Sequence, residues 1–174
     1  MSRAPQRAVL ALGSNLGDRL GMLQGALDAL GKMPGVDVVA VSGVYETAPV
    51  GGPPGQDPYL NAVILVDTTL LASVLLERCL AVEGALGRHR TERWGPRTLD
   101  IDVITYDDQV SADEALTLPH PRAYERAFVL VPWLSVDQGA TLPGRGRVAE
   151  LAAARRTDSV VARTDLRLHV PVAG

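Results

Sequence analysis

The sequence predicts an α+β fold, a ferredoxin-like α/β sandwich with a mostly antiparallel sheet and additional C-terminal elements. The expected elements come in the order strand, helix, strand, strand, helix, strand, which is the split β-α-β pattern of such folds. The chain has 174 residues, enough for one domain with a core of its own. Its composition, 47 % hydrophobic and 21 % charged, is ordinary for a globular protein.

The first three elements follow from the hydrophobic pattern. The stretch VLALG, which begins directly after Ala8, predicts a short buried strand that ends in glycine. The stretch SNLGD then offers capping side chains, and leucines recur at helical spacing over Leu20–Leu30 until Gly31 and Pro34 end the helix. Residues 36–47 are rich in β-branched side chains and predict one strand.

The pattern repeats after residues 48–58, a loop rich in glycine and proline. Residues 59–68 predict another strand. Residues 71–86 predict a helix, and its apolar face includes Cys79, the only cysteine, which we expect to be a buried core thiol. Residues 98–108 follow a charged loop and predict the fourth strand.

The C-terminal third adds elements to this pattern. Residues 116–136 predict a short extended piece followed by helix, and residues 146–154 predict a last helix. We therefore expect a single domain over residues 1–153. Residues 154–174 form a tail that can add an edge strand or remain flexible, and the sequence leaves both alternatives open.

Composition argues against nucleic-acid and membrane partners. The formal net charge is −3 and only 4 % of residues are aromatic, so neither a basic surface nor stacking platforms for bases are expected. No apolar run reaches the roughly 18 residues that a membrane span needs, and the N-terminal apolar stretch is too short for a signal peptide. We expect a cytoplasmic monomer that acts on small molecules.

The stretch RWGPRTLDID, residues 93–102, carries the strongest chemical signal. Alternation along a strand places Asp100 and Asp102 on one face, about 7 Å apart at Cα. Two carboxylates this close repel unless a cation lies between them, and magnesium is commonly held by one or two carboxylates together with substrate phosphates. The alternatives are a solvated strand face and ion pairs with nearby arginines.

The loop before this strand is rich in arginine although the chain is acidic. Guanidinium groups bind phosphate oxygens bidentately, and together with the two aspartates they predict a nucleoside triphosphate site rather than a merely exposed charged loop. The cluster consists of Arg88, Arg90, Arg93 and Arg97. No P-loop motif and no G-x-S-x-G motif occurs. His120, which lies between two prolines, can reach a phosphate or serve a structural role.

Five motifs in this order, GSNLGD, YETAPVGG, YLNAV, ERWGPRTLDIDVITY and LPHPRAYERAFVLVP, resemble the 6-hydroxymethyl-7,8-dihydropterin pyrophosphokinase family of folate biosynthesis. The similarity extends from about residue 8 to about residue 153. It implies that pyrophosphate passes from ATP to the hydroxymethyl group of the pterin, with release of AMP. It also implies two magnesium ions. The resemblance does not cover the last twenty residues.

The resemblance also implies roles for individual residues. Asp100 and Asp102 hold the magnesium ions and form the catalytic set with Arg88 and Arg97. The residues implied for ATP binding are Glu83, Arg88, Arg90, Trp94, Arg97, Val103, Thr117, His120 and Arg126. The pterin ring is expected between Tyr59 and Phe128, and the residues implied for its binding are Thr47, Ala48, Val50, Tyr59, Asn61, Trp94 and Phe128.

Two other functional classes compete with this interpretation. A magnesium-dependent nucleotidyltransferase or phosphodiesterase also uses paired aspartates with arginines, but it would release pyrophosphate or a nucleoside monophosphate product. A ferredoxin-like ligand- or RNA-binding module would carry exposed aromatic residues at the centres of its strands. The predicted central strands here consist mainly of valine, isoleucine, leucine and alanine.

Overall fold

The computed structural model describes residues 3–48, 55, 57–87 and 99–172. Its main sheet has the strand order β10-β3-β4-β1-β5, with β2 also paired to β4, and every pairing in it is antiparallel. This confirms the predicted α+β class with an antiparallel sheet. The strands are β1 (Gln6–Ser14), β2 (Val36–Val41), β3 (Tyr45–Thr47), β4 (Tyr59–Thr68), β5 (Asp100–Tyr106) and β10 (Val161–Ala162).

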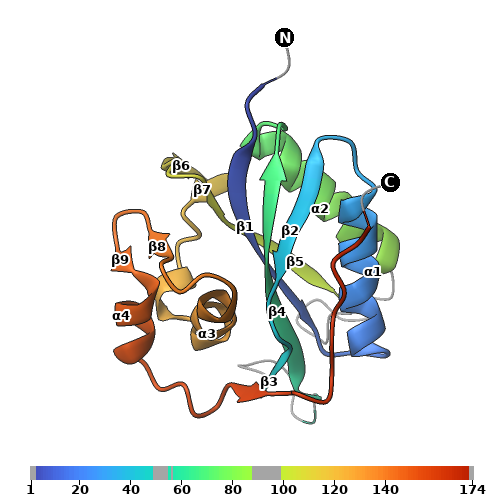
Figure 1. Cartoon of the computed structure of the whole chain (residues 1–174), viewed down its shortest axis with the longest axis vertical. Helices are drawn as coiled ribbons and strands as arrows, with labels where there is room; N and C mark the ends of the chain where they lie inside the picture. The colour runs from blue at the N-terminus through green and yellow to red at the C-terminus, as the bar shows by residue number, and fades with distance from the viewer. Residues whose placement is uncertain (1–2, 49–54, 56, 88–98, 173–174) are drawn as a thin grey trace.

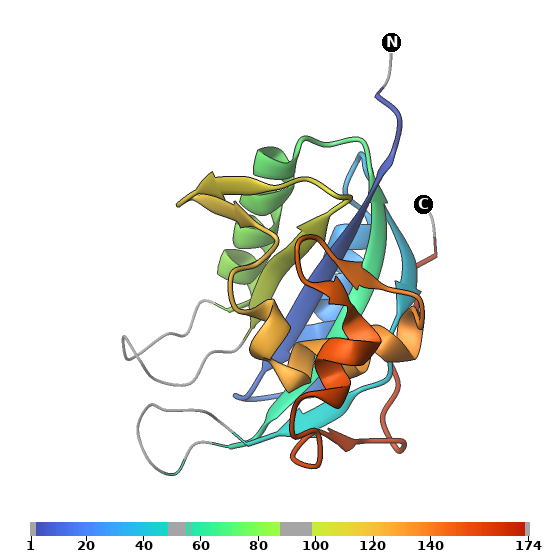
Figure 2. The ribbon, with the colours of Figure 1, turned by 90° about the vertical axis from the view of Figure 1, so that its left-hand side faces the viewer.

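Helices cover both faces of this sheet. Figure 1 shows α1 (Arg19–Gly31) and α2 (Ala72–Leu86) on one face and α3 (Ala127–Val136) on the other. Figure 2 shows α3 and α4 (Val148–Ala153) in front of the sheet. The short elements between them are β6 (Ser111–Asp113), β7 (Leu116–Leu118), the 3-10 helix η1 (Ala123–Glu125), β8 (Thr141–Leu142) and β9 (Gly146–Arg147).

Two hydrophobic cores lie on opposite faces of the sheet because its strands alternate. On β4, Ile64 belongs to the core under α1 and α2, whereas its neighbours Val63 and Leu65 belong to the core under α3. The first core also contains Cys79 of α2, as predicted. Burial, with a smaller contribution from Glu83 and Asp102, raises the pKa of this thiol to about 12.

The single strand predicted over residues 36–47 is wrong, because the structure divides it into β2 and β3. Ser42 stands at the interruption and pairs with Val63 of β4 in an unusual way. Its backbone N–H donates to the Val63 carbonyl at 2.9 Å, and its hydroxyl accepts from the Val63 N–H at 2.8 Å. The hydroxyl also donates to the Gly43 carbonyl at 2.7 Å. A side chain thus replaces a backbone acceptor there, so the chain can turn between the two strands.

The C-terminal segment, residues 155–172, lies against the domain. It pairs with β3 through β10 and then runs along α1 (Figure 1). The Gln24 side chain of α1 makes two hydrogen bonds to the His169 backbone, at 3.0 and 2.9 Å. Leu166 and Leu168 pack against the first core. Of the two alternatives that the sequence left open, the described residues adopt the edge strand.

No helix among the described residues is both long and apolar enough to cross a membrane.

Candidate active site

A cavity of about 720 Å³ opens on the face of the sheet that α3 covers. Its walls come from three parts of the chain that are far apart in sequence. The sheet and its margin contribute Ala11, Leu12, Gly13, Thr47, Ala48, Tyr59, Asn61, Asp100 and Asp102; η1 and the start of α3 contribute Arg122, Glu125, Arg126, Ala127 and Phe128; the C-terminal segment contributes Arg155, Ser159 and Val160.

Strand register assembles the floor of the cavity. Gly13 in β1 lies opposite Asn61 of β4 on one side and Asp100 of β5 on the other. Ala11, two residues earlier on the same face, lies opposite Asp102. Residues paired across antiparallel strands point to the same face of the sheet. The predicted metal-binding and pterin-binding residues are therefore neighbours across β1, which supplies only small side chains between them.

Asp100 and Asp102 project into the cavity as alternation predicted. The Asp102 side chain is 46 % exposed, and its Oδ2 lies 4.0 Å from a guanidinium nitrogen of Arg126. Among the described residues, no group of three or more His, Cys, Asp or Glu side chains is placed to hold a metal. A pair of carboxylates with further oxygen ligands from substrate phosphates is how proteins commonly hold magnesium, so this donor set fits that ion.

Glu83 connects α2 to the strand that carries the aspartates. Its Oε1 accepts a hydrogen bond of 2.6 Å from the backbone N–H of Ile101, the residue between Asp100 and Asp102. The outer edge of β5 is thereby held by a side chain at the end of α2. Glu83 therefore supports the geometry of the aspartate pair from behind.

His120 lies beside this end of the cavity. Its backbone N–H donates to the Ile104 carbonyl at 2.8 Å, and its Nδ1 accepts from the Arg122 N–H at 3.2 Å. Burial lowers the pKa of His120, the Arg126 and Arg122 charges lower it further, and Asp102 opposes them. With Nδ1 engaged as an acceptor, the proton of the neutral ring sits on Nε2 and is available as a donor.

Four of the described residues predicted to contact ATP are not among those that line the cavity: Glu83, Val103, Thr117 and His120. The Val103 side chain is 5 % exposed and packs in the core under α1 and α2, on the face opposite Asp102. Only its backbone, in β5, can therefore contact a ligand on the cavity side. Thr117 lies in β7, where its hydroxyl donates to the Asp113 carbonyl at 3.0 Å.

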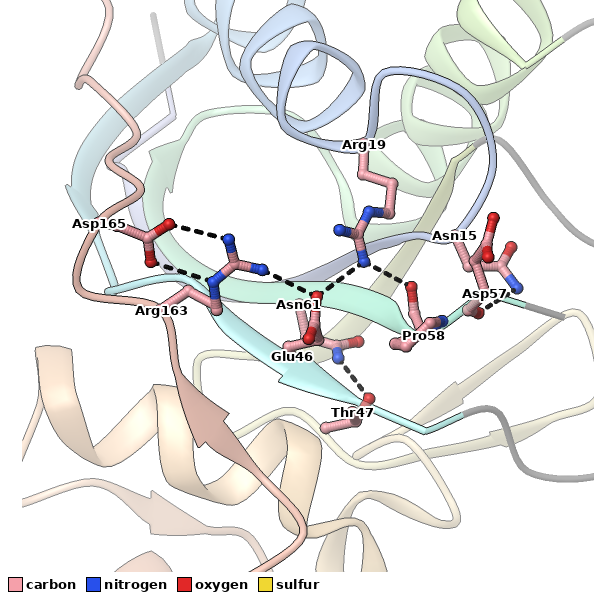
Figure 3. Close-up of polar contacts among 9 residues, drawn as sticks. All are labelled: Asn15, Arg19, Glu46, Thr47, Asp57, Pro58, Asn61, Arg163 and Asp165. Carbon is pink, nitrogen blue, oxygen red and sulfur yellow. Dashed lines mark hydrogen bonds and ion pairs between the residues drawn. The ribbon is translucent and has the colours of Figure 1, made fainter.

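The pterin-side residues meet at the other end of the cavity. The amide of buried Asn61 donates to the Thr47 hydroxyl at 2.7 Å, which fixes the amide's orientation (Figure 3). Tyr59 and Phe128 both line the cavity. The Arg126 guanidinium lies 5.6 Å from the centroid of the Phe128 ring, so one cation faces both this aromatic ring and Asp102.

The remaining predictions fall outside the described residues. These are the catalytic Arg88 and Arg97, the loop residues Arg90 and Trp94, and the pterin-side Val50.

The structure adds lining residues that sequence reasoning missed. Arg122 belongs to the LPHPR motif, so its proximity to a recognised stretch could have indicated it. Gly13 ends the first predicted strand, but which residues lie opposite it depends on cross-strand register. Arg155, Ser159 and Val160 come from the tail, where no motif or periodicity predicted a position near the cavity.

The family model of 7,8-dihydro-6-hydroxymethylpterin-pyrophosphokinase (HPPK) matches residues 9–138. Relatives named 2-amino-4-hydroxy-6-hydroxymethyldihydropteridine pyrophosphokinase include a Methylorubrum extorquens protein that is 49 % identical over 138 residues, 79 % of this chain and 87 % of the relative. A Mycobacterium leprae protein of the same name is 45 % identical over 170 residues, 91 % of this chain and 83 % of the relative.

Solved structures support the fold. The chain resembles the Plasmodium falciparum HPPK-DHPS wild type crystallised with pteroate, with a TM-score of 0.69 at 13 % identity. The match covers 88 % of this chain and 45 % of that one, so this chain spans less than half of its length. The family match over residues 9–138 and the two relatives show that the chain belongs to the 7,8-dihydro-6-hydroxymethylpterin-pyrophosphokinase family.

Proposed function

We propose that this cavity binds ATP, magnesium and 6-hydroxymethyl-7,8-dihydropterin together, and that its residues carry out the pyrophosphoryl transfer. The transfer to the hydroxymethyldihydropterin, a step of folate biosynthesis, is the reaction of the family to which the chain belongs. ATP as the donor, two magnesium ions and a cytoplasmic monomer complete the proposal. The observation that carries it is the shared floor on which Asp100 and Asp102 lie across β1 from Asn61.

The pterin is assigned to the end formed by Thr47, Tyr59, Asn61 and Phe128. Two aromatic side chains offer flat surfaces to a planar heterocycle, and a polar amide beside them suits its hydrogen-bonding edge. The hydrogen bond to Thr47 holds the Asn61 amide in one orientation before the ligand arrives. An orientation that is fixed in advance lowers the entropic cost of binding.

The triphosphate is assigned to the β5 end, where Asp100, Asp102, Arg126 and His120 gather. Bound magnesium would supply positive charge to the phosphate oxygens during transfer. Arg126 adds a cation beside Asp102, and His120 offers an Nε2–H donor toward a phosphate oxygen. Arg88 and Arg97 belong to the same proposal, although they lie outside the described residues.

In the reaction, the hydroxymethyl oxygen attacks the β-phosphorus, and the bond from that phosphorus to the α,β-bridging oxygen breaks. AMP leaves with that oxygen, and the β,γ-pyrophosphoryl unit stays on the pterin. We assign two roles to the Asp100 carboxylate. It orients the attacking hydroxyl through a hydrogen bond, and it receives the hydroxyl proton. Positioning and charge neutralisation account for most of the catalysis of such transfers, so no covalent intermediate is needed.

The test follows the products of ATP, magnesium and 6-hydroxymethyl-7,8-dihydropterin by chromatography. AMP should appear in equal amount with the pterin pyrophosphate. For Asp102→Asn we expect kcat to fall by about a thousandfold, because the charge that holds the metal is lost, while the dihydropterin still binds. Asp37→Asn, at an exposed position of β2, is the matched control and should leave kcat unchanged.

Two results would contradict the proposal. Release of free pyrophosphate, or AMP formation that does not depend on the dihydropterin, would indicate a nucleotidyltransferase or a phosphodiesterase instead. Full activity of Asp102→Asn would remove Asp102 from the metal site.

A further inference from the structure

We propose that the C-terminal segment is part of the substrate site, and that Arg163 in it is a positioning residue for the pterin side of the cavity. The inference rests on the proposed assignment of the pterin to Thr47, Tyr59 and Asn61. It concerns a stretch beyond residue 138, where the family model ends.

The segment passes from the cavity to the back of the sheet around the edge strand β3. Ser159 and Val160 line the cavity. The next two residues form β10, in which Val161 pairs with Glu46 and Ala162 with Tyr45. The backbone N–H of Arg163 then donates to the Val44 carbonyl at 2.8 Å. The tail thus contributes Ser159 and Val160 to the cavity wall on one face of the sheet. After β10, its residue Arg163 lies on the opposite face, beside α1.

Glu46 is the residue at which a charged side chain of this segment meets the sheet. Its Oε2 accepts from a guanidinium nitrogen of Arg163 at 2.9 Å and from one of Arg19 at 2.9 Å (Figure 3). All three side chains are half-buried, at 25 to 29 % exposure. The same Arg19 nitrogen donates to the Pro58 carbonyl at 2.8 Å. One carboxylate therefore connects the tail, the first residue of α1 and the residue before β4.

The two residues fixed in this way, Glu46 and Pro58, each precede a pterin-side residue. Glu46 precedes Thr47, and Pro58 precedes Tyr59. Thr47 and Tyr59 lie opposite each other in register. Because side chains alternate along a strand, Glu46 points to the α1 face while Thr47 points into the cavity. Arg163 also holds Asp165, two residues on in the tail, through hydrogen bonds of 3.0 and 2.8 Å (Figure 3). The two ion pairs of Glu46, together with the hydrogen bond from Arg19 to Pro58, therefore support the floor of the pterin side from behind.

The ion pairs of Glu46 are better suited to positioning Thr47 and Tyr59 than to stabilising the fold. Ion pairs that keep contact with solvent add little to stability. The tail is also anchored independently of them, through Gln24, Leu166 and Leu168. A small displacement of a substrate-positioning residue can nevertheless cost much in binding and rate. Loss of the Arg163 charge should thus change pterin affinity while the fold persists.

The test compares Arg163→Met with the wild type in the full chain. The dissociation constant of 6-hydroxymethyl-7,8-dihydropterin, measured by fluorescence titration, should rise about fivefold. The KM for ATP and kcat at saturating dihydropterin should change by less than about twofold, since the β5 end is untouched. Arg163→Lys keeps the charge but not the planar guanidinium. Its dissociation constant for the dihydropterin should therefore lie between those of the wild type and Arg163→Met.

Gln24→Ala is the matched control, because it loosens the same segment at His169 and leaves Glu46 untouched. It should leave dihydropterin affinity unchanged. Equal loss of affinity in Gln24→Ala, an unchanged dissociation constant in Arg163→Met, or an equal rise in the KM for ATP would each overturn the assignment. A wild type that shows no dihydropterin-dependent AMP formation would instead contradict the proposed function itself.

Discussion

At position 13 a side chain would crowd Asn61, one of the residues that we assign to the pterin. A Cβ added to Gly13 would lie 3.3 Å from Asn61 Oδ1 and 3.6 Å from Tyr59 Cδ1. Asn61 is 5 % exposed and its amide is tied to Thr47, so it has little room to move away. A side chain at position 13 would therefore require the Asn61 amide to shift by a few tenths of an ångström.

Gly13→Ala should weaken dihydropterin binding while leaving the KM for ATP nearly unchanged, because the added methyl displaces the Asn61 amide. Titration of the dihydropterin, together with steady-state kinetics in both substrates, measures this. Gly25→Ala is the control. Its Cβ meets Leu86 at an ordinary 3.4 Å, and alanine is favoured over glycine inside α1. A Gly13→Ala protein with wild-type affinity would show that the floor adapts.

Site residues were predictable from the sequence when their placement depends on a single strand. Asp100 and Asp102 share a face because of alternation, and that holds in any strand. Gly13 and Ser159 were not predictable in this way, because their place depends on which strands pair and in which register. The resemblance predicted Asn61 and Tyr59, and the structure explains their proximity to the aspartates through β1.

Among the elements, the interruption between β2 and β3 depends on one hydroxyl. Ser42→Ala removes the acceptor of the Val63 N–H and leaves that buried group without its partner. We expect a loss of about 1–3 kcal/mol in the free energy of unfolding, measured by urea denaturation. Ser111→Ala is the control, since its hydroxyl makes only a 3.3 Å exposed contact in β6, and it should cost less than about 0.5 kcal/mol.

An equal effect of the two substitutions would mean that the Ser42 hydroxyl is not needed to hold the interruption. Residues 36–47 were predicted as one strand because β-branched residues dominate them. Propensity reports the fit of each residue to a pleated surface, and it cannot indicate that a serine side chain will replace a backbone acceptor. By contrast, residues 59–68 were predicted with the bounds that β4 has, and the apolar run of residues 62–66 lies at the middle of the sheet.

For the whole molecule, the two cores should unfold together because β4 contributes to both. Leu27→Ala, in the core under α1 and α2, and Leu130→Ala, in the core under α3, should each lower the free energy of unfolding by about 2–5 kcal/mol. Urea transitions followed by far-UV circular dichroism and by fluorescence should coincide in both variants. Separate transitions in either variant would show that one face of the sheet can unfold alone.

The overall arrangement was predictable as far as the split β-α-β pattern extends. Both of its helices lie on one face of the sheet, and that pattern does not specify what covers the other. The C-terminal additions do so, with α3 filling the second face and the tail joining the sheet as β10. Tail pairing rests on backbone hydrogen bonds and on Glu46, which is distant in sequence, so no local periodicity indicated it.

The single buried thiol makes this chain convenient for spectroscopic labelling. Cys79 is enclosed by the first core and its pKa is raised to about 12, so it offers almost no thiolate to a maleimide or nitroxide reagent at neutral pH. A cysteine introduced at an exposed position such as Ser159 would then react alone, without removal of the native one. One dye on the cavity wall could report the arrival of each substrate in real time.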